Sequence, residues 1–220
     1  MSVSDSSVEN KPNYELIDPD VRLMLEVRNG SASAYEKLVK KYEQRIFGFF
    51  EHMVARDQAE DLAQEVFLRV FRARENYTPG AKFSTWLFTI THNVASNALR
   101  RRSRNMEFNL SPDSNRPGNT GALERLAISA SGHQPTRQLD NSERAEIVRA
   151  AIQSLKERQR TAVLLSKYEG MSYQEIADTM ELTPQAVKSL LSRARANLKD
   201  ILQPYLDTGI LPSSATPDDG

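Results

Sequence analysis

The chain has 220 residues, enough for one large domain or two small ones. Lysine plus arginine and aspartate plus glutamate both total 29, so the formal net charge is zero and indicates no class of partner. The absence of cysteine excludes a disulfide framework, a thiolate zinc site and a cysteine nucleophile. The histidines His52, His92 and His133 lack metal-ligand spacing, and the sequence has no phosphate-binding glycine loop. We therefore expect no cofactor, no metal and no enzyme activity.

Residues 1–10 are serine-rich and acidic and lack the apolar core of a signal peptide. We expect residues 1–14 to be disordered. No run in the sequence approaches the ~18 apolar residues that a membrane span requires. These two features predict a cytoplasmic protein without membrane insertion.

Helical periodicity runs through most of the first half of the chain, and strand signals are nearly absent. The pattern predicts four helices: a short one over 19–29, a second from Ser31 or Ser33 onward, a third over 58–74 and a fourth over 83–102. The four helices would pack as one bundle over residues 15–104.

The predicted third helix has an apolar side and a polar side. The polar side carries two carboxylates, an amide and one large apolar side chain: Asp61, Gln64, Glu65 and Leu68. A carboxylate–amide face with an apolar centre suits docking onto a basic partner surface. On this helix alone, a solvated face without a partner is the simpler interpretation.

The predicted fourth helix carries a polar stripe that includes Asn93, with Trp86 and Asn97 at its border and the arginine run 100–104 at its end. An exposed aromatic ring beside amides and arginines suits single-stranded nucleic acid, because it supplies stacking, edge-reading hydrogen bonds and phosphate neutralisation. Trp86 alone is more often a core residue. The turn of residues 76–82 could hold an extruded base against this surface.

The helical pattern stops between residues 105 and 140, where proline, glycine and serine clusters are typical of turns and linkers. Only 122–128 could form a helical turn or two. A stretch of this length is a functional loop or an interdomain linker. Helices are predicted to resume over 142–154 and 157–168, and the tail 203–220 is predicted to be disordered.

Residues 171–198 are typical of two helices joined by a short turn. Ser172 can cap the first helix, and Glu175 three positions later completes a capping box. Thr183 and Pro184 then supply an N-cap and a first-turn proline for the second helix. The pattern predicts a helix-turn-helix.

The exposed face of this second helix is polar and cationic. Residues 183–199 contain four cations and no carboxylate, and the face holds Gln185, Lys188, Ser189, Ser192 and Arg193. A short cationic helix held by a preceding helix can enter a DNA major groove. The alternative is an ordinary helical hairpin with a solvated basic face.

Four segments carry a resemblance to a known family. Residues 59–72 and 83–93, followed by Leu99-Arg-Arg-Arg102, resemble region 2 of bacterial sigma factors. The hairpin with Tyr173-Gln-Glu-Ile-Ala177 and Arg193-Ala-Arg195 resembles their region 4. Both regions in this order, without a full-size region 3, are similar to the extracytoplasmic-function (ECF) group of the sigma-70 family.

The resemblance implies a role for each surface. In the family, the positions matching Asp61, Gln64, Glu65 and Leu68 dock on the clamp helices of the polymerase β′ subunit. The −10 promoter element would be bound by the fourth helix and the turn before it, through Lys82, Phe83, Trp86, Asn93, Asn97, Arg100 and Arg101. The −35 element would be read by Gln185, Lys188, Ser189, Ser192 and Arg193. The implied partners are core RNA polymerase (β′ clamp helices and β flap), promoter DNA and an anti-sigma factor.

The sequence departs from the family pattern at three positions. Asn97 stands where many members have aspartate, and His92 stands where arginine is frequent, so the −10 preference is expected to differ. Leu190 occupies a place often held by arginine, which removes one phosphate contact.

We therefore expect an all-α protein with two helical domains: region 2 over 15–104 and region 4 over 141–202, joined by a long flexible linker over 105–140. Its expected function is to bind core RNA polymerase and direct promoter-specific transcription initiation, assisting promoter melting. A stand-alone helix-turn-helix regulator that never binds polymerase is the alternative. A purely structural helical adaptor is disfavoured because it leaves both basic surfaces without a purpose.

Overall fold

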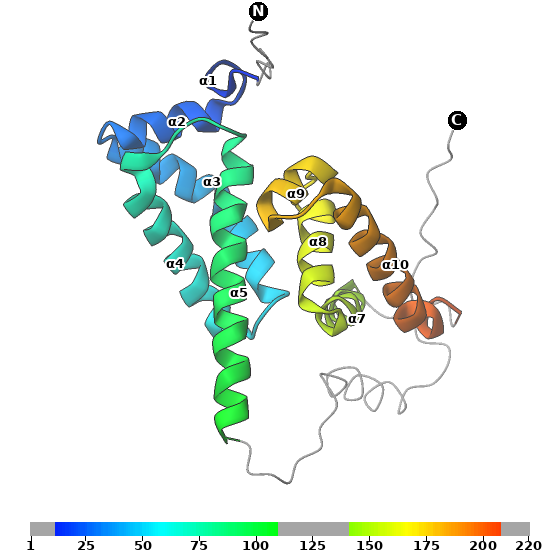
Figure 1. The fold of residues 1–220 in the computed structure, drawn as a ribbon. Coiled ribbons are helices and arrows are strands. Elements are labelled where there is room, and N and C mark those ends of the chain that lie inside the picture. Colours follow the sequence, from blue (N-terminus) through cyan, green and yellow to red (C-terminus); the bar gives the residue numbers. More distant parts are fainter. Residues whose placement is uncertain (1–11, 110–140, 208–220) are drawn as a thin grey trace, which may run out of the picture.

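The computed structural model describes residues 12–109 and 141–207. Within these two ranges the regular structure is helical and no strand is present, and the helices form two domains (Figure 1). The predicted all-α, two-domain fold is confirmed. No helix in either range is both long and apolar enough to cross a membrane.

The N-terminal domain is a bundle of helices around α5. Its elements are α1 (Tyr14–Ile17), α2 (Pro19–Arg28), α3 (Ala32–Glu51), α4 (Arg56–Ala73), the 3-10 turn η1 (Arg74–Asn76) and α5 (Phe83–Asn109). The C-terminal domain consists of α7 (Asn141–Ser154), α8 (Glu157–Lys167), α9 (Tyr173–Met180) and α10 (Pro184–Asp207). The helix-turn-helix predicted at residues 171–198 corresponds to α9 and the first part of α10.

Three helix boundaries differ from those predicted. Tyr14–Ile17 forms the short helix α1, capped by the side chain of Asn13, which accepts from the Glu15 amide. Helix α5 continues past its predicted end at 102 to Asn109. Helix α10 runs through Pro204 to Asp207, so the predicted disordered tail begins too early. The predicted linker and its helical turn at 122–128 lie largely outside the described residues.

Asp18 joins the start of two helices in the N-terminal domain. One carboxylate oxygen accepts from the Asp20 amide at 2.9 Å and caps α2. The other accepts from the Phe83 amide at 2.9 Å, at the first residue of α5. A carboxylate at these N-termini also interacts favourably with the helix dipoles. One side chain therefore positions the α5 N-terminus relative to α2.

The core is built from large apolar side chains of α3 and α5. Phe50, Phe83 and Phe88 are fully buried, and the Phe88 ring meets the Phe49 ring edge-on at a centroid distance of 6.0 Å. Full burial of one such side chain contributes roughly 1.5–3 kcal/mol to stability. The buried cluster continues from this bundle into the C-terminal domain without a break.

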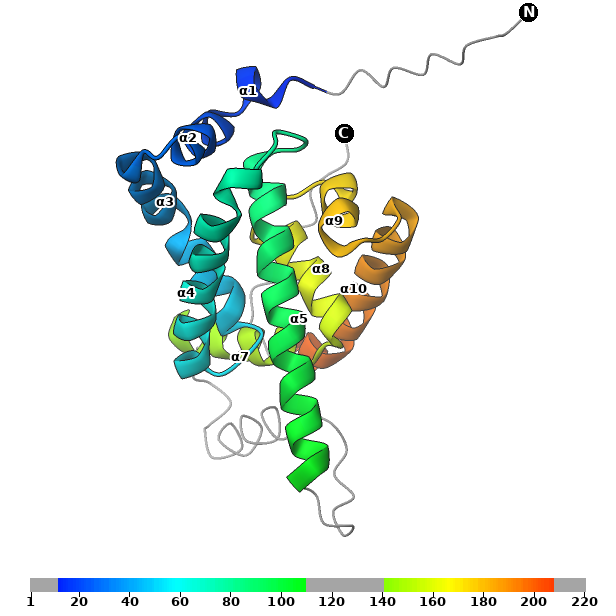
Figure 2. The same ribbon diagram turned by 60° about the vertical axis from the view of Figure 1, so that its left-hand side comes forward.

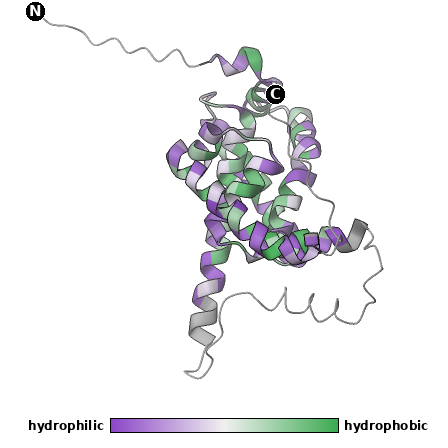
Figure 3. Cartoon of the chain, turned by 90° about the vertical axis from the view of Figure 1, so that its right-hand side faces the viewer, coloured by the Kyte–Doolittle hydropathy of each residue, from purple (hydrophilic) through white to green (hydrophobic). Residues whose placement is uncertain are grey.

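The two domains pack against each other, with α9 beside the first half of α5 in both views (Figures 1 and 2). The C-terminal end of α5 projects beyond the packed helices. Figure 3 shows hydrophobic ribbon concentrated where the helices pack and more hydrophilic ribbon along this projection. The projecting end holds the exposed arginines Arg100, Arg101, Arg102 and Arg104.

Candidate functional site

The helix-turn-helix is capped as the sequence predicts. The Ser172 hydroxyl accepts from the Glu175 amide at 3.3 Å, and the Glu175 carboxylate accepts from the Ser172 amide at 2.8 Å. At the start of α10, the Thr183 hydroxyl accepts from the Ala186 amide at 3.2 Å. These bonds satisfy amides that would otherwise be unpaired at the two N-termini. The capping box and the Thr183 cap are both confirmed.

The turn between α9 and α10 contains a strained residue. Glu181 has φ 54°, in the left-handed region that non-glycine residues rarely adopt. The Leu182 amide donates to the Ala177 carbonyl at 2.9 Å, which closes the end of α9. This turn sets the angle at which α10 leaves α9.

Helix α10 has one buried side and one polar, accessible side. Val187, Leu191 and Ala194 are buried. The predicted reading residues lie on the other side: Gln185, Lys188, Ser192 and Arg193 are exposed and Ser189 is half-buried. Side chains of this type on an exposed helix fit the major groove, where arginine or lysine can pair with guanine and glutamine with adenine.

The aromatic residues at the start of α5 divide into a core residue and a surface residue. Phe83 is only 1% exposed, and its ring packs against the rings of Tyr42 and Tyr77. Trp86 is half-buried, with its ring 4.8 Å from Tyr77 and 5.8 Å from Phe83. Phe83 therefore packs against the core side of Trp86. It cannot itself stack on a base in this conformation.

The polar residues predicted on α5 follow Trp86 along the helix. Asn93 is exposed, Asn97 is half-buried, and Arg100 and Arg101 are exposed. An asparagine side chain has both a donor and an acceptor, so Asn93 can read the edge of an unpaired base. Arg100 and Arg101 lie one to two turns further along the helix.

Lys82 of this surface, and Ser96 between Asn93 and Asn97, already have partners in the C-terminal domain. The Lys82 Nζ lies 2.8 Å from a Glu175 carboxylate oxygen, and the Ser96 hydroxyl donates to Glu157 at 2.9 Å. The hydrogen bond to Glu175 raises the pKa of Lys82. Burial raises the pKa of Glu175, but the bonds from Lys82 and Ser172 outweigh it, and the net pKa is lowered. Lys82 is therefore cationic and ion-paired at neutral pH.

The predicted docking residues share one face of α4. Asp61 and Gln64 are exposed, and Leu68 is 50% exposed. Glu65 is half-buried and accepts from Arg69 Nε at 2.7 Å, which lowers the pKa of its carboxyl group. Such an i,i+4 pair contributes only a few tenths of a kcal/mol to helix stability.

Phe71 extends this face and was not predicted. It is 43% exposed, and the Arg74 guanidinium lies 4.1 Å from its ring centroid. Its position three residues after Leu68 places it one helical turn further along the same stripe. That spacing is the signal in the sequence from which Phe71 could have been included.

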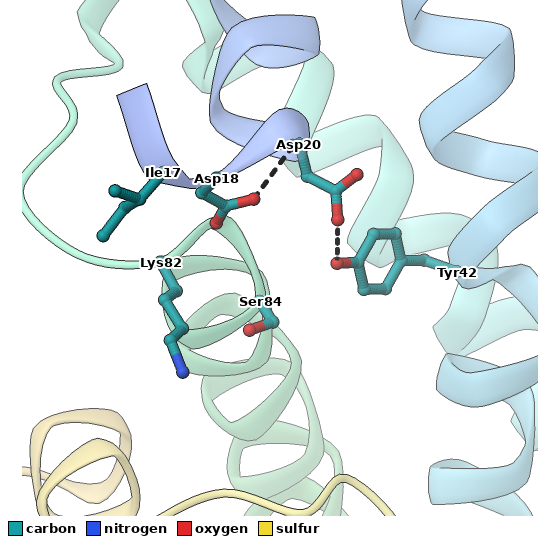
Figure 4. A pocket seen from close by; sticks show the side chains of 6 residues that line it. All are labelled: Ile17, Asp18, Asp20, Tyr42, Lys82 and Ser84. Carbon is teal, nitrogen blue, oxygen red and sulfur yellow. Dashed lines mark hydrogen bonds between the residues drawn. The ribbon is translucent and has the colours of Figure 1, made fainter. Parts of the chain in front are cut away.

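A recess of about 250 Å³ lies where α2, α3 and the start of α5 meet (Figure 4). Its two carboxylates are already engaged: Asp18 caps two helices, and Asp20 accepts from the Lys41 ammonium and the Tyr42 hydroxyl. Lys82 points away from both aspartates toward α9. The two carboxylates that line the recess are therefore used to hold the bundle together and are not open to a ligand.

Comparison with known families matches both domains. Residues 38–105 match the family described as Sigma-70 region 2, and residues 145–198 match Sigma-70, region 4. The RNA polymerase sigma-H factor of Pseudomonas aeruginosa is 33% identical over 197 residues, which cover 86% of this chain and 96% of that protein. The ECF RNA polymerase sigma-E factor of Haemophilus influenzae is 30% identical over 194 residues, covering 85% and 97%.

The chain belongs to the ECF group of sigma-70 factors. Sigma factors are transcription initiation factors, and this one serves promoter-directed transcription by RNA polymerase. Region 2 contains the α4 and α5 surfaces described above, and region 4 contains the helix-turn-helix.

Two solved structures share the fold of this sigma factor. CnrH in complex with the cytosolic domain of CnrY has a TM-score of 0.59 at 22% identity, covering 85% of this chain and 99% of that one. The sigma factor RpoE in complex with the anti-sigma factor NepR from Bartonella quintana has a TM-score of 0.58 at 22% identity, covering 77% and 96%. At this identity the likeness shows the fold alone.

Leu190 of the sigma factor packs against the core, half-buried on the border of α10. An apolar residue there adds packing within region 4. The contacts between regions 2 and 4 had no counterpart among the sequence-based predictions, since they join residues more than 60 positions apart.

Proposed function

We propose that the docking surface for core RNA polymerase is the face of α4 formed by Asp61, Gln64, Glu65 and Leu68, extended by Phe71. The observation that carries this assignment is a pair of exposed apolar side chains, Leu68 and Phe71, among carboxylates on one helix. Aromatic and aliphatic groups at the centre of a polar rim are typical of protein interfaces. The partner at this face is the pair of β′ clamp helices, with the β flap meeting region 4.

The −10 element is bound along α5. Trp86 stacks on an unpaired base, Asn93 and Asn97 read base edges, and Arg100 and Arg101 hold the backbone. Lys82 lies at the N-terminal end of this surface, and Phe83 supports Trp86 from the core. Stacking of a base on an aromatic side chain is worth roughly 1–3 kcal/mol.

The −35 element is read as duplex by the first turns of α10. Gln185, Lys188, Ser192 and Arg193 are the exposed side chains that reach the groove, and Ser189 lies between them. Polymerase supplies the chemistry, and the sigma factor carries no catalysis of its own. It acts in the cytoplasm with polymerase, and an anti-sigma factor of the kind bound in the related structures restrains it.

A transcription assay tests the docking surface. When combined with core polymerase, the Leu68→Ser variant should lose most run-off transcription. Its affinity for core polymerase should also fall in a direct titration. The matched control is Leu16→Ser, which alters a leucine that is 73% exposed on α1, away from α4. Equal polymerase affinity of the two variants would remove α4 from the interface. A chain that binds DNA but never polymerase would instead support the stand-alone regulator.

A further inference from the structure

The C-terminal part of α5 carries a serine among four arginines. The sequence there is Leu99-Arg-Arg-Arg-Ser-Arg104, and Ser103 and the four arginines are all exposed. We call residues 100–104 the arginine–serine segment. Two of its arginines belong to the proposed −10 surface, whereas Ser103 has no part in it. The serine hydroxyl is therefore accessible and unused by the proposed function.

The arginine–serine segment lies where α5 projects beyond the packed helices (Figures 1 and 3). Leu99 is the last described side chain of α5 that packs against the core. A helix end with few buried apolar contacts opens locally at a low cost in free energy. A second protein can therefore reach Ser103 and unwind the helical turn that contains it.

The arginines of this segment keep their charges available to a partner. None of them forms an ion pair with a side chain in the ranges 12–109 and 141–207 that the structure describes. The bond from Arg69 is the main cause that lowers the pKa of Glu65 on α4, and Arg101 contributes least to this shift. The segment is therefore a cluster of four positive charges around one hydroxyl group.

Arginines that precede a serine form a pattern that an enzyme can recognise. Protein kinases distinguish their substrates by the charges around the hydroxyl group. Arg100, Arg101 and Arg102 stand three, two and one residues before Ser103. Carboxylates in the substrate groove of a kinase can bind these guanidinium groups through charge-assisted hydrogen bonds. The segment thus has the chemistry of a substrate for a kinase with an acidic groove.

We propose that Ser103 is a phosphorylation site for a serine/threonine protein kinase that recognises arginine, and that its phosphate weakens DNA binding at the end of α5. The kinase transfers the γ-phosphoryl group of ATP to the Ser103 Oγ. The Oγ–P bond forms, the bond from this phosphorus to the bridging oxygen of ADP breaks, and the hydroxyl proton passes to a base of the kinase. The effect on DNA rests on the proposed −10 assignment, whereas the site itself does not.

The phosphate acts on the arginines by its charge and by its position. A phosphoserine carries about −1.5 to −2 charges at pH 7 and has three acceptor oxygens. Arg100 lies three residues before Ser103 on the same face of α5, so its guanidinium can bind this phosphate. While Arg100 binds the phosphoserine, it cannot hold a DNA phosphate. The net charge of the segment also falls by about two.

The first test asks whether the cells that encode the chain phosphorylate this serine. Extracts of growing and starved cells, with Mg²⁺ and labelled ATP, are added to the full chain, and the phosphate is mapped by mass spectrometry. Phosphate should appear on Ser103, and Arg100→Gln, Arg101→Gln should reduce it strongly. A chain without phosphate on Ser103 would overturn the proposal, whichever other serines are modified.

Ser192 on α10 is the matched control for recognition. It is exposed on a helix and followed by an arginine, as Ser103 is, but Leu190 and Leu191 precede it. It should therefore take up little phosphate. Equal phosphorylation of the two serines would show that exposure alone directs the kinase, and would overturn the role assigned to the arginines.

The second test measures the effect of the phosphate on DNA binding. The full chain with Ser103→phosphoserine, introduced during synthesis, is compared with the parent for binding to a random-sequence single-stranded DNA over a range of salt concentrations. Loss of about two positive charges should reduce the slope of log K against log salt by about 1.4 and weaken binding roughly 20-fold at about 0.1 M salt.

The control for this test is Ser33→phosphoserine. Ser33 is exposed in the first turn of α3, at the other end of the N-terminal domain (Figures 1 and 2). The same charge placed there should weaken DNA binding far less. An equal loss in the two modified chains would overturn the direct action of the phosphate on the arginines.

The unmodified variant Arg100→Gln, Arg101→Gln distinguishes the two ways in which the second test can fail. If this variant binds single-stranded DNA as well as the parent, the −10 assignment of these arginines fails, and the effect on DNA fails with it. If it binds weakly but Ser103→phosphoserine has no effect, the assignment holds and the action of the phosphate is overturned. The first test decides the phosphorylation site in both cases.

Discussion

The two proposed DNA surfaces of this sigma factor are built in different ways. In region 4, polar reading residues stand on one side of α10 and the core residues Val187, Leu191 and Ala194 on the other. In region 2, the proposed −10 surface shares its aromatic side chains with the core, and Trp86 rests on Tyr77 and Phe83. Substitutions in region 4 should therefore report on DNA recognition alone, whereas those in region 2 mix recognition with folding.

The largest expected effect distinguishes a buried core residue from a DNA-contacting residue in region 2. Phe83→Ala should lower the free energy of unfolding by about 3–5 kcal/mol, because a buried aromatic ring is removed and a cavity remains. Urea unfolding followed by circular dichroism measures this loss. The matched control is Phe71→Ala on the surface of α4, which should lower stability by only about 1–2 kcal/mol, because its partly exposed ring contacts Tyr35 and Arg74 and leaves no closed cavity. A small loss for Phe83→Ala would mean that this residue is a surface contact.

The next effect belongs to region 4. Lys188→Ala and Arg193→Ala should leave stability and polymerase binding intact, because both side chains are exposed. A residue that reads a base edge should lose about 1–3 kcal/mol of discrimination at one position. A residue that holds phosphate should weaken binding evenly and reduce the salt slope by about one. Competition binding on −35 duplexes distinguishes the two, and unchanged binding by both variants would contradict the α10 assignment.

A smaller effect concerns the turn that orients α10. Glu181→Gly should raise the free energy of unfolding by up to about 1 kcal/mol, since glycine adopts the left-handed conformation without a steric penalty. The gain is reduced by the greater freedom of glycine in the unfolded chain. Thermal unfolding compares this variant with Asp178→Gly, which lies inside α9 and should be destabilised. A loss of stability in Glu181→Gly would show that the left-handed conformation of residue 181 does not strain the folded protein.

The smallest effect is a pH dependence in region 2. Burial, and to a smaller extent Arg158, lowers the pKa of His92, while Glu157 and Glu181 raise it. The net pKa of His92 lies below the ordinary histidine value. The unfolded chain then binds more protons, so stability is complete above about pH 6.5, the ordinary histidine pKa, and falls as the pH drops below it. One proton limits the slope to about 1.4 kcal/mol per pH unit. His92→Gln should flatten unfolding profiles between pH 7 and 5, and an unaltered slope would contradict the assignment.

Local rules were sufficient for the helix-turn-helix. Ser172, Glu175 and Thr183 are caps whose partners lie three residues away, so their bonds follow from sequence spacing alone. The polar face of α10 follows from helical periodicity in the same way. Periodicity also placed Leu68 on the exposed side of α4, but the same stripe was not followed to Phe71.

Contacts distant in sequence were not predictable by these rules. Phe83 is buried because Tyr42 and Tyr77, from two other segments, close over its ring. Arg45 meets Glu169 across 124 positions of sequence, and no local pattern marks either residue. Such contacts depend on how two domains pack, which the spacing within one helix does not encode.

The most direct test of the contrast between the two surfaces is strand opening at a promoter. Permanganate footprinting of unpaired thymines compares Asn93→Ala with Arg193→Ala, each bound to core polymerase. Asn93→Ala should form a closed complex but open the −10 region poorly, and a pre-melted bubble should rescue it only in part, since the base-reading contact is still missing. Arg193→Ala should bind the promoter less tightly and open normally once bound. Normal opening by a folded Asn93→Ala protein would contradict the placement of the −10 surface on α5.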